Sequence, residues 1–455
     1  MEHLTAREPD AAYSPDHETP DATRDSGLRR VLGVGFGVAV GIGSMIGAGI
    51  LRAPADVAAK LPTPALFLGV WVVGGLYALL GGNAISELGV AVPRSGGQYV
   101  YARRAFGPYV GFVVGWSDWL SSAGSVAAIA IAMAESVAAL LGAGARAVPV
   151  IAMGAVLIAY GVLQRGVRVG DRAQRLTSAV KALALLALVG ACVVAARPHA
   201  AAAPNAHAGA AAFVLALSGV IYSYDGWTGP IYFSGELRDP GREVPRAVFG
   251  GVLSGMVLYL AVNAAFLAVL SIDAMSRSTL VAADVARALA GGRGASLVHW
   301  LVVLSLPSAV VANLLLASRV GYAMGHDGAA PRALGAVSAS GVPSAGLAVS
   351  FAAAVLFAAT GAFEQVIAVC AFLFVASYVV SFVALFVLRR REPELPRPFR
   401  AWGHPWTTGL AVVASSAFLL GVVAADPRGA AVSVACVAVT WPLYLVLRRA
   451  GLLAG

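Results

Sequence analysis

The stretch Gly43-Ser44-Met45-Ile46-Gly47-Ala48-Gly49 closes an apolar segment, residues 31–51, that contains no charged residue and is long enough to cross a bilayer. A second apolar segment, residues 210–235, is interrupted near its middle by Tyr222-Ser223-Tyr224-Asp225-Gly226-Trp227-Thr228-Gly229-Pro230. A helix interrupted within lipid leaves backbone N–H and C=O groups unpaired, and such breaks occur only where these groups line a cavity or contact a ligand. Two matching breaks in one membrane chain therefore predict a solute-binding site between them.

The composition is that of an integral membrane protein. Of the 455 residues, 59% are hydrophobic and 12% are charged, and the mean hydropathy is +0.80, whereas soluble domains carry roughly 25% charged residues. The net charge of +9 does not indicate a nucleic-acid partner, because the basic residues lie between apolar segments, where they act as topology signals in the lipid bilayer. Cys192, Cys370 and Cys436 lie inside apolar runs without the spacing of a metal site, so we expect no metal and no cofactor.

Windows of roughly 20 apolar residues predict twelve transmembrane helices. The predicted spans are 31–51, 65–92, 108–141, 147–163, 176–196, 210–235, 245–270, 296–322, 344–361, 364–388, 408–425 and 430–447. Lys and Arg are concentrated in the alternate connections that share a side with both termini, which predicts that both termini are cytoplasmic in a multi-pass protein of the cell membrane. Residues 1–30 are polar and lack the apolar core of a signal peptide, so we expect a disordered cytoplasmic tail.

The two broken segments divide residues 31–451 in a regular way. Residues 31–197 and 210–388 each hold five predicted spans, and each set begins with a broken one. Because five is odd, the second set enters the membrane with the opposite polarity. We therefore expect an all-α fold with discontinuous helices 1 and 6 and an inverted five-plus-five repeat, with residues 408–447 as two appended helices.

Broken helices supply two kinds of ligand-binding group. The N-terminal end of a half-helix presents N–H groups that suit a carboxylate, and a C-terminal end presents C=O groups that suit an ammonium. A zwitterionic amino acid carries both charges on one carbon, so two facing breaks can bind it through the backbone. Gly47 and Gly49 would allow the ligand to approach closely. The alternative for Gly43 and Gly47 is helix packing, because their spacing fits a small-xxx-small pattern.

The sequence resembles the amino acid–polyamine–organocation superfamily of permeases, and within it the L-type amino acid transporter branch and its bacterial relatives. The first signature is Gly43 to Ile50 together with Tyr222 to Trp227. Further matching motifs follow predicted spans 2, 6, 8 and 10, so the resemblance covers nearly the whole transmembrane region. These motifs are Pro93-Arg94-Ser95-Gly96-Gly97-Gln98-Tyr99, Glu236 to Arg246, Ser318-Arg319 with Asp327-Gly328-Ala329-Ala330-Pro331, and Arg389 to Phe399.

The resemblance implies a binding site for an amino acid substrate. It places the substrate carboxylate at the backbone amides of Gly47, Ala48 and Gly49, and the amino group at the carbonyls of Met45 and Tyr222. Tyr222 also falls where relatives carry an aromatic gate, and Ala48 replaces a small hydroxyl residue common in the family. The full predicted substrate-binding set is Met45, Ile46, Gly47, Ala48, Gly49, Tyr222, Ser223, Tyr224, Asp225 and Asn313. Animal relatives pair with a glycoprotein through a cysteine in an outer loop, but the cysteines here lie in spans, so no disulfide-linked partner is implied.

Lys181 lies well inside the fifth predicted span. It follows Arg175 by six residues, so it is about 9 Å deeper at 1.5 Å per residue. Its stem is long enough to return the ammonium to the interface, and an ionisable group in this place is also a functional candidate. The resemblance favours function, since sodium-independent relatives carry a fifth-span lysine where sodium-coupled ones bind sodium. Ser305 or Ser308 is then its expected partner, and a proton is the candidate coupling ion.

Other polar residues within the spans have two interpretations each. Asp225 either caps the break or binds the substrate. Asn313 and Tyr378 either line the cavity or hydrogen-bond neighbouring helices. We expect Asp118 to form hydrogen bonds between helices and Glu87, near the inner interface, to pair with an arginine from a loop.

The function that these observations favour is secondary transport of neutral amino acids, as an exchanger or a proton-linked permease that works by alternating access without sodium. A cationic amino acid or polyamine transporter is the alternative, because Asp225 adds a negative charge to the site. A receptor or channel is the least favoured class. We do not expect an enzyme, because the spans contain no HExxH motif, Ser/His couple or paired aspartates, and the absence of GxxxxGK[ST] argues against ATP-driven pumping.

Overall fold

The structure is a computed structural model that describes residues 45, 47–94, 96–164, 170–195, 208–232, 234, 237–337 and 343–453. The predicted tail 1–30, most of the first apolar segment and Ile46 lie outside these residues. The described part of the chain consists of helices and their connections, as the all-α class predicts.

The described helices follow one another along the chain. They are α2 (Ala48–Lys60), α3 (Pro64–Ala91), α4 (Gln98–Phe106), α5 (Pro108–Leu141), η1 (Ala145–Ala147), α6 (Val148–Gln164), α7 (Gly170–Ala195), α8 (Ala210–Tyr224), α9 (Gly229–Tyr232), α10 (Pro240–Val269), α11 (Ile272–Ser276), α12 (Val281–His326), η4 (Arg332–Gly335), α13 (Ser344–Ala359), α14 (Phe363–Arg391), α15 (Trp406–Ala425), α16 (Pro427–Ala438) and α17 (Thr440–Arg449).

Local sequence explains where several of these helices begin and end. The Thr63 hydroxyl accepts a hydrogen bond from the Leu66 amide at 3.3 Å, and Pro64 takes the first helical position of α3, where no N–H is needed. Pro108 opens α5 in the same way. Gly142 ends α5 in the left-handed conformation, with φ +64°, which glycine adopts without steric cost.

The helices have the length and surface of membrane spans. Within the described ranges, eight helical segments are long and apolar enough to cross a bilayer, and shorter apolar helices cover Val180–Ala195, Ala210–Tyr224 and Ser344–Ala359. Large apolar side chains such as Leu157, Ile158 and Leu356 remain exposed on them, as expected of surfaces that face lipid. The protein is therefore a multi-pass membrane protein. The count of twelve spans and the inverted repeat stay predictions.

The predicted span 296–322 is part of a longer helix. Helix α12 extends from Val281 to His326, but Ala290 and Gly291 depart from helical backbone angles, and Gly291 has φ +63°. This kink divides α12 into a short first arm and a long second arm. The second arm contains the predicted span, so the sequence pattern located the long arm and missed the short helical arm before it.

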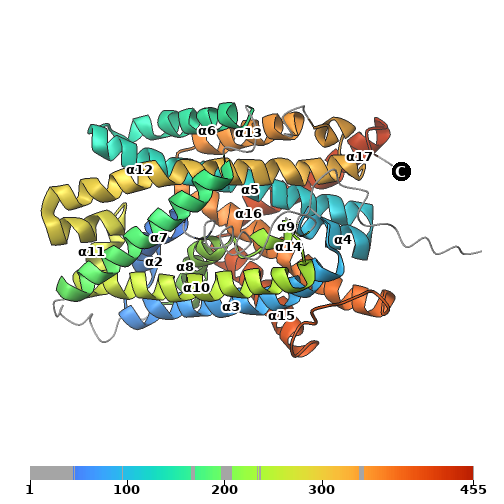
Figure 1. Ribbon diagram of the computed structural model, residues 1–455, viewed down its shortest axis with the longest axis horizontal. Helices are drawn as coiled ribbons and strands as arrows, with labels where there is room; N and C mark the ends of the chain where they lie inside the picture. Colours follow the sequence, from blue (N-terminus) through green and yellow to red (C-terminus); the bar gives the residue numbers. More distant parts are fainter. Residues whose placement is uncertain are drawn as a thin grey trace, which may run out of the picture.

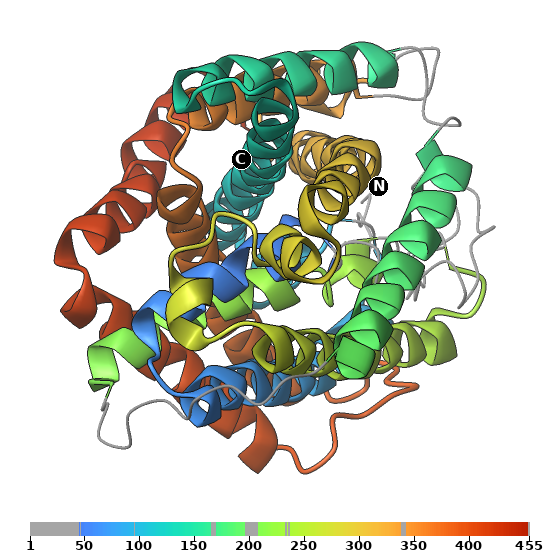
Figure 2. The ribbon, with the colours of Figure 1, turned by 90° about the vertical axis from the view of Figure 1, so that its left-hand side faces the viewer.

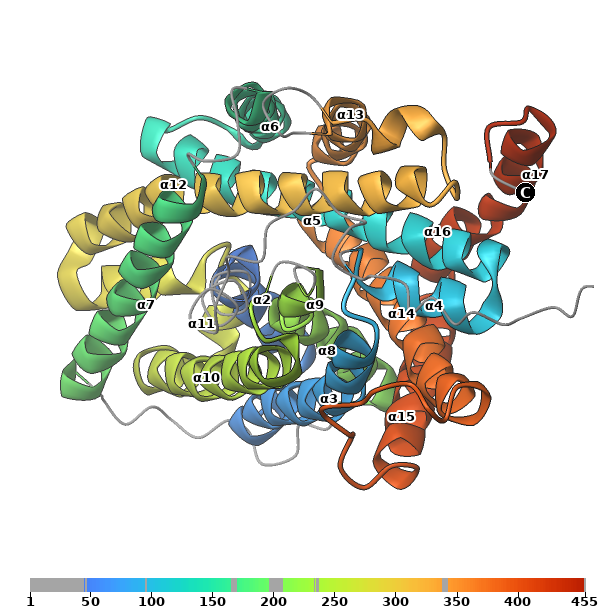
Figure 3. The ribbon, with the colours of Figure 1, turned by 45° about the vertical axis from the view of Figure 1, so that its right-hand side comes forward.

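The long helix α5 lies alongside α12 in the upper half of the view (Figure 1). It packs against α12, α13 and α14, while α3 packs against α10 on the opposite side of the molecule. Seen end-on, the short helix α2 lies in the interior, where it packs against α8 (Figure 2). The helix α7 crosses one flank and packs against both α10 and α12 (Figure 3).

The described parts of both broken segments lie in the centre of this arrangement. Helix α8 ends at Tyr224, the chain turns through Gly226 with φ +125°, and α9 begins at Gly229. All four residues of α9 are buried. In the first segment, Gly47 has extended backbone angles and α2 begins at the next residue. The predicted break between Tyr222 and Pro230 is thus present, in a part of the chain that is largely buried.

Candidate functional site

A small cavity separates the two broken segments from α5, α12 and α14. Its volume is about 50 Å³, which exceeds the roughly 10–15 Å³ that a cavity needs to hold one water molecule. Most of the predicted substrate-binding residues form its wall. They are Met45, Gly47 and Gly49 from the first break, Tyr222, Ser223 and Asp225 from the second, and Asn313 from α12.

One predicted residue, Tyr224, faces away from the cavity. The Tyr224 side chain is 1% exposed, and its hydroxyl donates to the Trp71 carbonyl at 3.1 Å. Its ring also packs against Tyr259 with 4.9 Å between centroids, so Tyr224 contributes to packing beside the site. Ala48 supplies the first residue of α2, and Ile46 lies outside the described residues.

One face of α5 forms the cavity wall opposite the breaks. Asp118, Ser122, Ser125 and Ile129 line the cavity, and their spacing places them on one side of a helix. The Tyr232 hydroxyl donates to the Asp118 carboxylate at 2.6 Å, so the predicted hydrogen bond between helices is present. The position of Asp118 on the cavity was not predicted, although polar residues three and four apart in an apolar helix were a signal for it.

The freed carbonyl groups of the two breaks meet at one hydroxyl. The Tyr259 hydroxyl, on α10, lies within hydrogen-bonding distance of the carbonyls of Met45 and Ser223, the latter at 2.7 Å. The Met45 carbonyl also accepts the Gly47 amide at 2.8 Å, and the Tyr222 carbonyl accepts the Asp225 amide at 3.2 Å. A ligand that uses these groups must therefore exchange with existing hydrogen bonds.

Asp225 both shapes the break and faces the cavity. Its carboxylate accepts hydrogen bonds from the Tyr378 hydroxyl on α14 and from the Gly226 amide, and it forms part of the cavity wall. The two interpretations of Asp225, capping and lining, are therefore compatible in geometry. Asn313 likewise lines the cavity, while its amide donates to the Ala309 carbonyl at 2.9 Å in its own helix.

An ion cluster, which we call the Arg52 cluster, lies on one side of the cavity. The Arg52 guanidinium contacts the carboxylates of Glu135 at 3.1 Å and Glu364 at 3.2 Å. It also lies 5.2 Å from the centre of the Phe363 ring, which meets the Tyr222 ring edge-on with 6.5 Å between centroids. The cluster joins α2, α5 and α14 directly beyond the aromatic side chain that the sequence predicts as a gate.

A second cluster, the Asp327 cluster, lies on the opposite side of the cavity. The Asp327 carboxylate accepts from Arg94 at 2.8 Å, pairs with Arg103 at 3.1 Å and contacts the Tyr99 hydroxyl at 3.3 Å. Burial and this carboxylate raise the pKa of Tyr99 above its usual range, so the hydroxyl stays protonated and can donate. Tyr99 packs against Gly115, and twenty residues of α5 separate Gly115 from Glu135, roughly 30 Å at 1.5 Å per residue.

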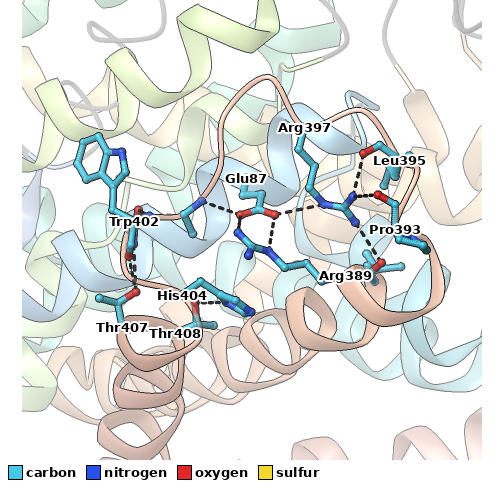
Figure 4. Close-up of polar contacts among 12 residues, drawn as sticks. Glu87, Arg389, Pro393, Leu395, Arg397, Trp402, His404, Thr407 and Thr408 are labelled. Atoms are coloured by element: carbon cyan, nitrogen blue, oxygen red, sulfur yellow. Dashed lines mark hydrogen bonds and ion pairs between the residues drawn. The ribbon is translucent and has the colours of Figure 1, made fainter.

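A third cluster, the Glu87 cluster, attaches the loop between α14 and α15 to α3 (Figure 4). Arg389 donates two hydrogen bonds to the Glu87 carboxylate, at 2.6 and 2.8 Å, and Arg397 contacts it at 3.3 Å. The Ala401 amide adds a donor at 2.6 Å. Because Glu87 is fully buried, these donors compensate its desolvation. The predicted pairing of Glu87 with an arginine is confirmed.

Lys181 lies in the interior of the protein. It is 2% exposed, which does not match a side chain extended to a membrane surface. Its helix α7 packs against α12, which carries Ser305 and Ser308. Ser308 donates to the Ser305 carbonyl at 2.8 Å. Among the described residues there is no group of three or more His, Cys, Asp or Glu side chains that could hold a metal.

Comparison with known proteins places this architecture in a family. The model of the family described as amino acid permease matches residues 37–447. The serine/threonine exchanger SteT of Bacillus subtilis is 28% identical over 404 residues, covering 88% of this chain and 92% of SteT. The human b(0,+)-type amino acid transporter 1 is 26% identical, covering 83% of this chain and 80% of the relative. The mouse Asc-type amino acid transporter 1 is 28% identical, covering 82% and 73%.

The family match extends over the two breaks, the cavity wall and the clusters on both sides of it. The relatives are all named as amino acid transporters or exchangers, and the family match alone covers most of the chain. The protein belongs to the amino acid permease family of the amino acid–polyamine–organocation superfamily.

Proposed function

We propose that this protein is a secondary transporter that moves amino acids across the cell membrane by alternating access, as an exchanger or a proton-linked permease. The observation that supports this most strongly is the position of the cavity. It is bounded by both helix breaks and lies between the Arg52 cluster and the Asp327 cluster. Opening one cluster while the other stays closed would expose the cavity to one side of the membrane at a time.

The proposed topology has twelve spans in an inverted five-plus-five repeat, with both termini in the cytoplasm. In this orientation the Asp327 and Glu87 clusters face the cytoplasm and the Arg52 cluster faces outward. The arginines of the first two clusters lie in the connections that the sequence assigns to the inside, which supports the orientation. The 23 residues of Pro427–Arg449 supply the last span in this scheme, although α16 and α17 divide it.

The proposed substrate is a small neutral amino acid. Its carboxylate would meet the amides at the start of α2, and its ammonium would lie near the Tyr222 carbonyl and Asp225. The small volume of the cavity supports a short side chain, and one relative is named as a serine/threonine exchanger. A cationic amino acid is the second candidate, because two carboxylates, Asp118 and Asp225, line the cavity.

Transport is proposed to be independent of sodium, with Lys181 in the place where relatives bind that ion. The burial of Lys181 and the packing of α7 against α12 support this role. Ser305, which is also buried, lies on the helix that this role requires as the partner.

Reconstitution into proteoliposomes tests the function. We expect radiolabelled serine, threonine or alanine to enter vesicles that are preloaded with the same unlabelled amino acid, with or without sodium. Uptake of lysine or ornithine in preference to these would select the cationic alternative. Vesicles that take up none of these amino acids in counterflow would reject the proposal, and strict dependence on sodium would reject the role of Lys181.

A further inference from the structure

Two buried carboxylates share the central cavity. Asp118 is 1% exposed, and both Asp118 and Asp225 form part of the wall. The wall that the described residues form contains no Lys, Arg or His side chain. A zwitterionic amino acid has no net charge, so with both carboxylates ionised the loaded cavity would hold two uncompensated negative charges.

The two carboxylates have unequal support from hydrogen-bond donors. Asp225 accepts from the Tyr378 hydroxyl and from the Gly226 amide. Asp118 accepts from the Tyr232 hydroxyl through Oδ1 alone. Its Oδ2 atom is buried and has no hydrogen-bond partner among the described residues. Asp118 is therefore the carboxylate whose ionised form the protein stabilises less.

The ligand itself can compensate only one of the two charges. Its single ammonium is expected beside Asp225, which adjoins the carbonyls of the second break. A buried carboxylate left without an opposite charge or sufficient donors is neutralised by a proton, because keeping it ionised costs more than taking the proton up. The free Oδ2 atom of Asp118 is the position available for that proton.

We propose that Asp118 binds a proton on Oδ2 and that this proton crosses the membrane together with the amino acid. The inference rests on the proposed transport function and names its coupling group. The proton enters from water on the side to which the cavity first opens, and Asp118 releases it to water on the other side. No bond other than the O–H bond forms or breaks, and one positive charge moves with each substrate.

The contact with Tyr232 connects this proton to the conformational change. Tyr232 belongs to α9, the short second half of the broken segment, whereas Asp118 belongs to α5. Gln98 hydrogen-bonds the Tyr232 side chain and in turn accepts from Ser381 at 3.1 Å. This chain of contacts keeps Tyr232 aimed at Asp118. Movement of α9 away from α5 would break the hydrogen bond and admit water to the carboxylate.

The other titratable and charged groups around Asp118 come from several elements. The cavity itself adds Tyr222, Asp225 and Tyr232. Helix α14 adds Tyr378, which contacts Asp225, and Cys370, whose Sγ lies 3.4 Å from the Ser121 carbonyl. Further groups lie towards the Asp327 cluster. Tyr99 and Arg103 are on α4, Arg319 is on α12, and Asp327 directly follows the end of α12.

The first test measures proton movement by the unmodified protein. Proteoliposomes containing a pH-sensitive dye are given external substrate at symmetric pH, with valinomycin and potassium to prevent a membrane potential from building up. We expect the interior to acidify, with about one proton per amino acid. An inward gradient of one pH unit should then support about tenfold accumulation. Counterflow without acidification would overturn the proposal but leave the transport function intact, whereas absence of counterflow would reject transport itself.

Two variants assign the proton to Asp118. In Asp118→Asn, we expect whatever substrate flux remains to occur without acidification and without accumulation above equilibrium. Asp273→Asn is the matched control, since Asp273 is exposed and lies outside the cavity; its proton-to-substrate ratio should equal that of the parent protein. Acidification at an unchanged ratio in Asp118→Asn would overturn the proposal.

Tyr232→Phe covers the case in which Asp118→Asn has no measurable flux. It removes the donor that favours the ionised carboxylate, so the pH of half-maximal proton-driven uptake should move upward. An unchanged pH profile would overturn the proposal. The unmodified protein is also tested with lysine as the substrate. If lysine enters and carries positive charge inward without acidifying the interior, Asp118 pairs with the substrate side chain instead of a proton, and the proposal is overturned.

Discussion

Gly49 packs directly against Ser223, so that a methyl group on Gly49 would lie 2.7 Å from the Ser223 Cα atom. This contact joins the two helix breaks by their backbones. Ser223 cannot easily withdraw, because its carbonyl accepts from Tyr259 at 2.7 Å and its own hydroxyl donates to the Gly219 carbonyl at 2.7 Å. The first break therefore requires glycine here for a reason of space, independent of any ligand.

Replacing Gly49 should disturb both transport and stability. In Gly49→Ala the added methyl group must displace backbone, and such overpacking typically costs about 1–3 kcal/mol. We expect a lower melting temperature for the purified protein and a large loss of substrate flux in proteoliposomes, because the cavity wall changes shape.

Gly69→Ala is the matched control for this variant. Gly69 lies within α3, and a methyl group there has no other atom within 4 Å. Alanine is favoured over glycine in a helix by about 0.5–1 kcal/mol, so this variant should keep or gain stability and transport normally. Equal behaviour of the two alanine variants would contradict the requirement for glycine at position 49.

The Glu87 cluster should make a large contribution to stability. In Glu87→Gln the two arginine side chains lose their shared carboxylate, and breaking one partner of a buried ion pair typically costs about 3–5 kcal/mol. Arg397 is only 6% exposed, so solvent cannot replace the lost charge. We expect a marked decrease in the melting temperature and faster proteolysis of the loop between α14 and α15.

Arg104→Ala provides the comparison at the surface. Arg104 pairs with Glu392 at 2.6 Å, but both side chains are about a third exposed, and such pairs contribute about 0–1 kcal/mol. The melting temperature should therefore change little. If Arg104→Ala destabilises the protein as much as Glu87→Gln, burial is not what gives the Glu87 cluster its strength.

The sequence predicted the second break well because its cause is local. Glycine, proline and aspartate near Asp225 interrupt a long apolar run, and a helix in lipid tolerates such residues only at a cavity. The pairing of Glu87 could also be predicted, because a carboxylate at the edge of a span needs a nearby cation. Its partner Arg389 lies 302 residues away, and only the fold identifies it.

The cavity wall on α5 was harder to predict. Asp118 forms a hydrogen bond between helices, as expected, and also lines the cavity, because the bond partner Tyr232 belongs to the second break itself. Conversely, Tyr224 shares the motif of Tyr222 and Asp225 but faces Trp71. Which side of a broken helix faces the ligand depends on the direction of the chain at the break, and sequence spacing does not determine it.

The Asp327 cluster is expected to hold one side of the cavity closed. In Asp327→Asn both Arg94 and Arg103 lose a charged acceptor, and each 1.4 kcal/mol of lost stabilisation shifts the populations about tenfold. With Ser122→Cys as a reporter in a background without the native cysteines, we expect faster reaction with an impermeant thiol reagent added from the Asp327 side.

Arg52→Ala should give the converse result. It removes the cation shared by Glu135 and Glu364, so the same reporter should react faster from the Arg52 side. Each variant is thus the control for the other. Equal acceleration from both sides in either variant would indicate general loosening of the bundle and would contradict alternating access controlled by these clusters.

Substitution of Lys181 tests the role proposed for it in sodium-independent transport. Lys181 is buried, and its helix α7 packs against both α10 and α12, so Lys181→Ala removes a charge that solvent cannot replace. We expect insertion and monodispersity to be retained and turnover to fall by about tenfold, which corresponds to about 1.4 kcal/mol. Arg146→Ala, at an exposed site within η1, removes an equal charge and should leave turnover unchanged. Normal turnover in Lys181→Ala would mean that the buried ammonium has no part in transport, and the sodium-independent role proposed for it would have to be abandoned.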